Sequence, residues 1–133
     1  MILVDSSVLI SYLKGDDTPS ADKLVRIIER KLPFGICPQI YLEVLQGAAG
    51  EKDFSRLREY LGSQIFYTLP DTLESYTKAA RMYFELRRKG KTAGSSIDCL
   101  IALTAIENDL FLLHNDADFD KIARYFPLRT WTD

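Results

Sequence analysis

Histidine, cysteine and long hydrophobic runs are scarce in this sequence of 133 residues. The only histidine is His114, and the two cysteines, Cys37 and Cys99, each lie inside an apolar stretch without a Cys-x-x-Cys or Cys/His pattern. This excludes a zinc site built on histidine and cysteine, and it argues against a metal-free ribonuclease that uses two histidines. We expect His114 to be structural and both thiols to be buried and reduced, as in a cytoplasmic protein.

A membrane segment and an excess of positive charge are also lacking. No apolar run approaches the roughly 20 residues that cross a bilayer, and the N-terminus reaches Asp5 without the basic region of a signal peptide. We therefore expect a cytoplasmic location and no membrane partner. The formal net charge of −2 does not favour a general nucleic-acid-binding protein. An enzyme remains compatible with this charge, because bound divalent cations reverse the potential of an acidic cleft.

Short apolar runs alternate with helical patterns along the chain. The runs predict strands at 2–4, 34–37, 64–69, 110–113 and 128–131. The helical patterns include residues 8–13, 21–28, 38–47, 53–61, 72–88, 97–105 and 119–125. Strands separated by helices imply right-handed βαβ units, and so an α/β fold with helices on both faces of a parallel sheet. With no repeat, low-complexity tract or linker, we expect one domain over 1–133.

Acidic residues follow several of the predicted strands. Asp5 ends the first strand, and Asp116 follows the strand at 110–113. Glu43 lies on the helix after the second strand, and Asp98 is in the first turn of an apolar helix. Ligand sites of open parallel sheets form beyond the carboxyl ends of the strands, so these side chains can converge. Clustered carboxylates repel one another and lose hydration, and Mg²⁺ or Mn²⁺ would compensate their charge.

Each acid also has an explanation that needs no metal. Asp5, followed by two serines, can belong to a helix cap, and Ser6 or Ser7 can cap the first helix. Asp98 is favoured near a helix N-terminus by the helix dipole. Glu43 can lie on a solvated helix face, and the acids over 116–120 can form a turn and an N-cap. Spacing therefore leaves both a metal site and ordinary capping open.

Four segments together resemble the PIN-domain family, and in particular the VapC-type toxins of toxin–antitoxin pairs. They are Ile-Leu-Val-Asp-Ser-Ser-Val-Leu-Ile (2–10), Ile-Tyr-Leu-Glu-Val-Leu-Gln-Gly (40–47), Ser-Ile-Asp-Cys-Leu-Ile-Ala (96–102) and Leu-Leu-His-Asn-Asp-Ala-Asp-Phe-Asp-Lys-Ile-Ala (112–123). They occur in the family's order and extend over nearly the whole chain. The opening segment is a weak signal by itself, whereas the four in order are a strong one.

The resemblance implies a fold, an activity and a set of site residues. The fold is a PIN-like three-layer α/β/α domain with a central parallel sheet, and the activity is that of an endoribonuclease with Mg²⁺, or Mn²⁺, as cofactor. The catalytic acids that the resemblance implies are Asp5, Glu43, Asp98 and Asp116. Of these, Asp5, Asp98 and Asp116 would bind the metal. Supporting roles would fall to Ser7, Asn115 and Asp118, with Asp118 an alternative to Asp116.

The resemblance also implies partners: an RNA substrate, a cognate VapB-like antitoxin that covers the acidic cleft, and a second copy in a homodimer. A cluster of cations at the end of the longest helix is the densest basic patch. It consists of Arg87, Arg88, Lys89 and Lys91. These residues can be ordinary helix-end cations or contacts to an RNA backbone. The aromatic residues Tyr76, Tyr83 and Phe84 are expected in the core or in an interface.

Three other protein classes share part of this pattern. A haloacid-dehalogenase-like phosphatase also opens with a strand that ends in aspartate, but its chemistry needs a second aspartate where this chain has Ser7. A response-regulator receiver needs an acidic pair near the first strand and a late lysine at a strand end, and neither can be placed. The non-enzymatic alternative is a PIN-like module that binds RNA or a protein without cutting.

Overall fold

The computed structural model describes residues 1–91 and 94–133. In these residues, five short strands form one sheet in the order β3-β2-β1-β4-β5, and every neighbouring pair is parallel. The strands are β1 (Ile2–Val4), β2 (Phe34–Ile36), β3 (Ile65–Phe66), β4 (Phe111–Leu113) and β5 (Arg129–Thr130). Each of the five predicted strands is confirmed. The first has the predicted bounds, and the other four are shorter than predicted, most of all the third, which was expected over 64–69.

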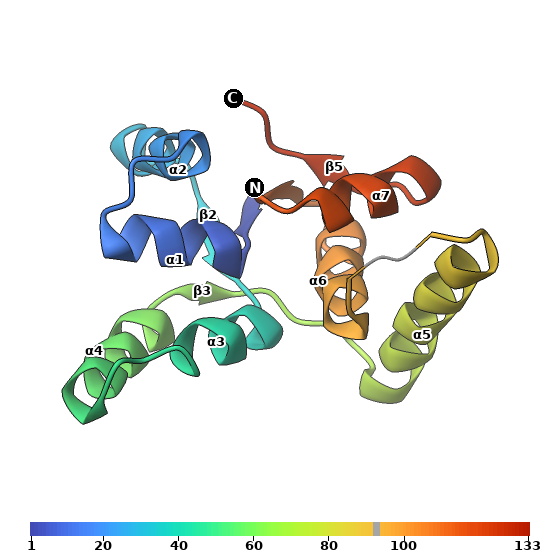
Figure 1. Cartoon of the computed structure of the whole chain (residues 1–133), viewed down its shortest axis with the longest axis horizontal. Helices are drawn as coiled ribbons and strands as arrows, with labels where there is room; N and C mark the ends of the chain where they lie inside the picture. The colour runs from blue at the N-terminus through green and yellow to red at the C-terminus, as the bar shows by residue number, and fades with distance from the viewer. Residues whose placement is uncertain (92–93) are drawn as a thin grey trace.

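Helices connect each strand to the next. They are α1 (Ser6–Lys14) and α2 (Pro19–Glu29) before β2, α3 (Pro38–Leu45) and α4 (Glu51–Gly62) before β3, α5 (Thr72–Arg88) and α6 (Ser96–Glu107) before β4, and α7 (Ala117–Tyr125) before β5. Helices α1 to α4 lie on one side of the sheet, and α5 to α7 lie on the other (Figure 1). The predicted three-layer α/β/α arrangement is therefore confirmed.

The core lies on both faces of the central strands. All three residues of β1 are buried, as expected for a strand that pairs on both sides and is covered on both faces. Helix α6 is buried continuously from Cys99 to Ala105, so it is apolar on every side rather than along one stripe. Burial raises the pKa of both cysteine thiols, Cys37 and Cys99, to about 11. Among the described helices, none has the length and apolar character that a membrane crossing requires.

The strand order determines where a ligand site can form. From β1 the chain adds β2 and β3 on one side, then returns to the other side of β1 to add β4 and β5. The connections therefore leave β1 and β4 in opposite directions, and a crevice opens at the carboxyl ends of these two strands. Asp5 directly follows β1, and Asp116 lies three residues after β4. The topology thus brings two of the predicted acids to the same edge of the sheet.

Candidate metal centre

Asp5 connects the end of β1 to the start of α1. It is the N-cap of α1, and its Oδ2 accepts hydrogen bonds from the backbone N–H of Ser7 (3.2 Å) and from the Ser7 hydroxyl (2.7 Å). The expectation that Ser6 or Ser7 is the cap is wrong, because both serines already lie within the helix while Asp5 keeps an extended backbone. Asp5 is only 3% exposed, and this burial raises the pKa of its carboxyl despite the hydrogen bonds from Ser7.

Ser7 also connects the two central strand ends. Its hydroxyl oxygen accepts the backbone N–H of Asn115 (3.2 Å), which lies just beyond β4. The same hydroxyl donates to Asp5, so one side chain fixes the ends of β1 and β4 relative to each other. The sequence predicted support from Ser7 and Asn115. In the structure the contact of Asn115 is made by its backbone amide.

Asp116 follows β4 and caps α7. Its Oδ1 accepts the backbone N–H of Asp118 (2.9 Å), while its own N–H donates to Nδ1 of His114 (3.2 Å). The His114 ring packs against Phe119, with the ring centroids 5.1 Å apart, and burial lowers the pKa of the imidazole. His114 is therefore a buried neutral ring that accepts a backbone hydrogen bond beside the acids. This is the structural position that the sequence analysis favoured for it.

Asp98 is held by a capping box at the start of α6. Its backbone N–H donates to the Ser95 hydroxyl (3.3 Å), and its Oδ2 accepts the backbone N–H of Ser95 (3.2 Å). The preceding Gly94 lies against two carboxylates: a Cβ at that position would overlap Oδ2 of Asp98 and Oδ2 of Asp118. Its φ of +61° also favours glycine. A residue without a side chain thus leaves room for two acids to approach each other.

Glu43 reaches the site from α3. Its Oε1 accepts a hydrogen bond from the Ser6 hydroxyl (3.0 Å), a contact between residues 37 positions apart in sequence. Partial burial raises the pKa of Glu43, and the charges of Asp5 and Asp116 raise it further. Glu43 is therefore close enough to the other acids to feel their charge. It is not simply a solvated position on an amphipathic helix.

Carboxylate oxygens of Asp98, Asp116 and Asp118 all lie within 4.8 Å of one another. Desolvation raises the pKa of Asp98 to about 6, and the charges of Asp116, Asp5 and Glu43 add to this increase. An all-oxygen donor set with excess negative charge is the ligand environment that Mg²⁺ and Mn²⁺ prefer. The cluster of Asp98, Asp116 and Asp118, called the acid cluster below, therefore fits a divalent cation.

The four predicted acids thus gather at one edge of the sheet, but only two of them belong to the acid cluster. Asp98 and Asp116 belong to the acid cluster, together with Asp118, which the sequence analysis gave only a supporting role. Asp5 and Glu43 lie close enough to influence the pKa of Asp98 but are outside that trio. Two contributors, Ser6 and Gly94, were missed. The glycine before two serines at a helix start was visible in the sequence, whereas the contact of Ser6 with Glu43 had no local signal.

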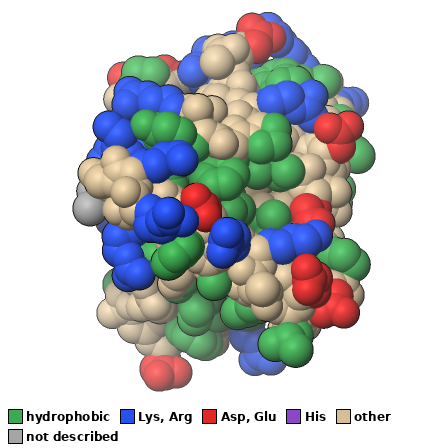
Figure 2. Space-filling view, turned by 90° about the vertical axis from the view of Figure 1, so that its right-hand side faces the viewer, with side chains coloured by type: hydrophobic (Ala, Val, Ile, Leu, Met, Phe, Trp, Pro, Cys, Tyr) green, Lys and Arg blue, Asp and Glu red, His purple; other side chains and the backbone are tan. Residues whose placement is uncertain are grey.

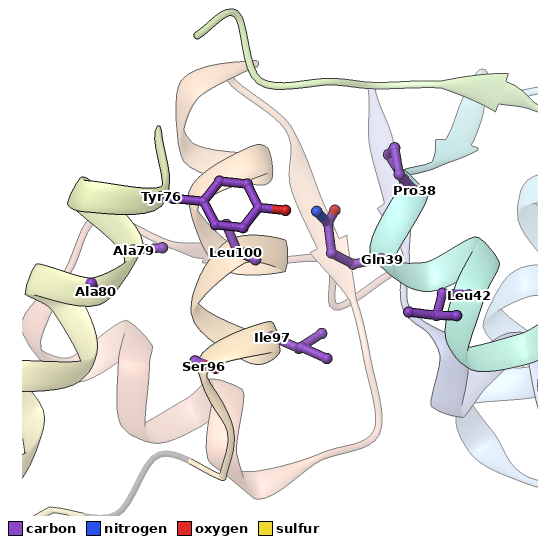
Figure 3. Close-up of a pocket in the computed structure, with 9 residues that line it drawn as sticks. All are labelled: Pro38, Gln39, Leu42, Tyr76, Ala79, Ala80, Ser96, Ile97 and Leu100. Atoms are coloured by element: carbon purple, nitrogen blue, oxygen red, sulfur yellow. The ribbon is translucent and has the colours of Figure 1, made fainter. Parts of the chain in front are cut away.

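A groove of about 470 Å³ begins beside the acid cluster and runs between α3 and α5. In Figure 3, Tyr76 and two alanines of α5 face Pro38, Gln39 and Leu42 of α3 across the start of α6. Leu42 and Tyr76 are 54% and 50% exposed, so this apolar surface is open. The groove is adjacent to Asp98 because Ser96 and Ile97, from the same helix turn, belong to its lining.

The predicted basic residues lie at the opposite end of α5. Arg87 and Arg88 are in its last turn, Lys89 is its C-cap, and Lys91 follows as an exposed residue. Residues 92 and 93, which follow Lys91, lie outside the described residues.

Comparisons with known proteins agree with this fold. The PIN domain family profile matches residues 2–125. Ribonuclease VapC11 of Mycobacterium tuberculosis and VapC ribonuclease Mb1587 of Mycobacterium bovis are each 33% identical over 130 residues, which is 97% of this chain and 96% of theirs. The match therefore extends over essentially the full length of both proteins.

Solved structures share the fold at lower identity. VapBC-1 of nontypeable Haemophilus influenzae has a TM-score of 0.69 at 20% identity and covers 100% of this chain and 98% of its own. VapBC2 of Rickettsia felis, bound to a promoter DNA fragment, has a TM-score of 0.67 at 20% identity, with 99% and 100% covered. FitAcB of Neisseria gonorrhoeae has a TM-score of 0.68 at 18% identity, with 99% and 97% covered. At these identities the likeness concerns the fold.

Proposed function

The chain belongs to the PIN-domain family, and we propose that it is a divalent-metal-dependent endoribonuclease of the VapC type, the toxin of a toxin–antitoxin pair. The observation that carries the proposal is the acid cluster at the crevice between β1 and β4. Lys121 lies 3.4 Å from one of these carboxylates, that of Asp118. Three carboxylates so close together, with two more acids nearby, carry more negative charge than one lysine compensates, and a bound divalent cation would offset the rest. A module that only binds RNA gains nothing from this repulsion.

We propose Mg²⁺ as the cofactor, with Mn²⁺ able to replace it, because every donor in the acid cluster is an oxygen. A divalent cation bound there supplies Lewis acidity to a phosphodiester oxygen and to the attacking water. Asp98, Asp116 and Asp118 bind the cation directly in this proposal. Asp5 and Glu43 strengthen the negative potential behind it and reach it directly or through water, since Mg²⁺ keeps several waters.

The remaining site residues hold these acids in position. Ser7 donates to Asp5 and accepts the Asn115 amide, so it keeps the two strand ends in register. Ser6 holds the Glu43 carboxylate by a 3.0 Å hydrogen bond. The capping residues of α6 and α7 fix the acid cluster through backbone contacts, so little rearrangement is needed when a cation binds.

The proposed partners include a cognate VapB-like antitoxin and a second copy of the chain, in the cytoplasm, where both thiols stay reduced. The solved structures with this fold include toxin–antitoxin complexes. The open apolar groove between α3 and α5 is our candidate for the homodimer face. Light scattering of the purified chain tests this: we expect a dimer that Leu42→Arg converts to a monomer. A wild-type monomer would contradict it.

The test of the activity is cleavage of a mixed RNA panel by the purified chain with Mg²⁺, with Mn²⁺ and with EDTA. We expect metal-dependent cutting that Asp98→Asn abolishes and Asp17→Asn preserves, because Asp17 is an exposed turn residue remote from the acid cluster in the chain. RNA binding without cutting, together with no detectable binding of Mn²⁺, would instead favour the non-catalytic PIN-like module.

A further inference from the structure

The C-terminal half of α5 carries cations that lie over aromatic rings. The guanidinium groups of Arg81 and Arg88 each lie 5.5 Å from the ring centroid of Phe84. At the end of the helix, the Lys89 ammonium lies 5.7 Å from the ring of Tyr125 on α7. We call these five residues, together with Arg87, the cation–aromatic surface. Figure 2, which faces this side of the molecule, shows Lys and Arg side chains interleaved with hydrophobic ones along its left part.

This surface has a positive charge that the rest of the chain does not share. Residues 76–91 include six cations and a single acid, Glu85, although the whole chain has a net charge of −2. Glu85 is shared by Arg81 (3.2 Å) and Arg88 (3.9 Å), so it neutralises only one of them. Within the described residues, Arg87 and Lys89 form no ion pair. The excess charge is therefore available to a ligand.

The cations are exposed and already oriented. The side chains of Arg81 and Arg88 are 69% and 63% exposed, and the Phe84 ring beneath them is 39% exposed. Contacts to the ring and to Glu85 restrict their rotamers, so less entropy is lost when they bind phosphate. A base can stack on a guanidinium plane that already rests on an aromatic ring. Because stacking needs an unpaired base, the chemistry fits a single strand rather than a duplex.

The surface also lies near the acid cluster. Tyr125 ends the helix that Asp116 caps, and it follows Asp118 by seven residues, a rise of about 10 Å along α7. A strand that enters the acid cluster meets repulsion between its phosphates and the carboxylates. The cation–aromatic surface lies at the other end of α7, where Lys89 contacts Tyr125. Its positive charge offsets that repulsion for the nucleotides that flank the cleaved bond.

We infer that the cation–aromatic surface binds single-stranded RNA that flanks the cleaved bond, with phosphates on Arg81, Arg88 and Lys89 and a base stacked beside Phe84. The inference rests on the proposed ribonuclease function for the identity of the ligand. It extends that function by assigning RNA contacts to residues outside the acid cluster. Arg81, Phe84 and Tyr125 had no such role in the sequence analysis.

The experiment measures binding without cleavage. Fluorescence anisotropy of a labelled oligouridylate is followed in EDTA with the Asp98→Asn protein, so that neither metal nor cutting is needed. Into this background we introduce Arg81→Gln with Arg88→Gln. The matched control is Arg56→Gln with Arg58→Gln on α4, where both arginines are also exposed.

We expect the α5 pair to weaken binding at least tenfold and the α4 pair to leave it within twofold. The slope of log affinity against log salt should fall by about 1.4, since each lost phosphate contact to a single strand contributes about 0.7. Phe84→Leu keeps an apolar side chain but removes the ring. It should weaken binding of oligouridylate at least fivefold and leave binding of an oligouridylate–oligoadenylate duplex unchanged.

Equal RNA affinity of the α5 and α4 double variants would overturn the inference. It would also be overturned if Phe84→Leu weakened binding of the single strand and of the duplex to the same extent. The result is separable from the proposed function. If the wild-type chain cuts RNA, and the double variant Arg81→Gln with Arg88→Gln binds and cuts RNA as well as wild type, only the inference fails. If nothing is cut but binding depends on the α5 pair, only the nuclease proposal fails.

Discussion

Replacement of Asp98 by asparagine should stabilise the metal-free protein while it destroys the site. Folding raises the pKa of the Asp98 carboxyl from 3.8 to about 6, so the charged form is disfavoured in the folded state. Above both pKa values this corresponds to at most about 3 kcal/mol of lost stability, and solvent screening of a partly exposed group reduces it to about 1–2 kcal/mol. Asparagine removes the charge and retains an oxygen that can accept the Ser95 amide, so the cap of α6 should survive.

The sign of the pH dependence follows from the raised pKa. The Asp98 contribution to stability is fully present below pH 3.8, where the carboxyl is protonated in both states, and is lost as the pH rises through about 6. In EDTA at pH 7.5 we therefore expect Asp98→Asn to unfold about 3–8 °C above wild type. Toward pH 4 the difference should vanish.

Thermal unfolding with and without Mn²⁺ completes the assay. At a metal concentration of 100 times Kd, the wild-type protein should gain about 2.7 kcal/mol, and Asp98→Asn should gain little. Asp17→Asn, an exposed change of the same chemistry, should behave as wild type in every condition. A variant less stable than wild type in EDTA at pH 7.5, or a difference that does not change with pH, would refute the electrostatic reasoning.

Three further substitutions test other parts of the site. Gly94→Ala should weaken Mn²⁺ binding at least tenfold in calorimetry, because its methyl overlaps two carboxylates. Gly90→Ala is the control, since Gly90 also has a positive φ (+73°) but open space around it, and equal losses in both would contradict the overlap. Ser7→Ala removes a 2.7 Å hydrogen bond to a buried carboxylate and should cost about 1.5–3 kcal/mol in urea unfolding. A cost below about 0.5 kcal/mol would show that this hydrogen bond contributes little. His114→Leu leaves the Asp116 N–H without its acceptor and should lower kcat for RNA cleavage, whereas His114→Asn, whose amide oxygen can replace Nδ1, should restore most of it. Equal kcat in the two variants would argue against a positioning role.

The sequence predicted the fold well because its signals are local. The apolar run at β1 and the turn residues after it predict a buried parallel strand without any knowledge of its neighbours. The same reasoning places an acid at the end of β1 and another after β4. It could not rank Asp118 above Asp5 as a member of the acid cluster. Asp118 belongs to the cluster because of the direction in which α7 leaves its cap, and Asp5 is buried behind it at the end of β1. Neither fact can be read from the local sequence.

Contacts between distant segments account for the other differences. The hydrogen bond from Ser6 to Glu43 joins α1 to α3, and neither residue has a local pattern that indicates its partner. Gly94 is needed because two acids from α6 and α7 converge on it, and this follows only from their relative positions in space. The sequence could not choose Asp5 over Ser6 and Ser7 as the N-cap of α1, for a simpler reason. Ser6, Ser7 and Asp5 are all good capping residues, and only the observed backbone distinguishes them.

The central position of β1 has a consequence for synthesis of the chain on the ribosome. β1 is made first, yet one of its two neighbours in the sheet is β4, which begins at residue 111. At translation rates of ~5–20 residues per second, residue 118 follows residue 5 by about 6–23 seconds. For most of that interval the nascent chain has no member of the acid cluster. Asp98 is made first, and Asp116 and Asp118 follow only at its end. An enzyme that cuts RNA therefore acquires its proposed metal site only after residue 118 has been made.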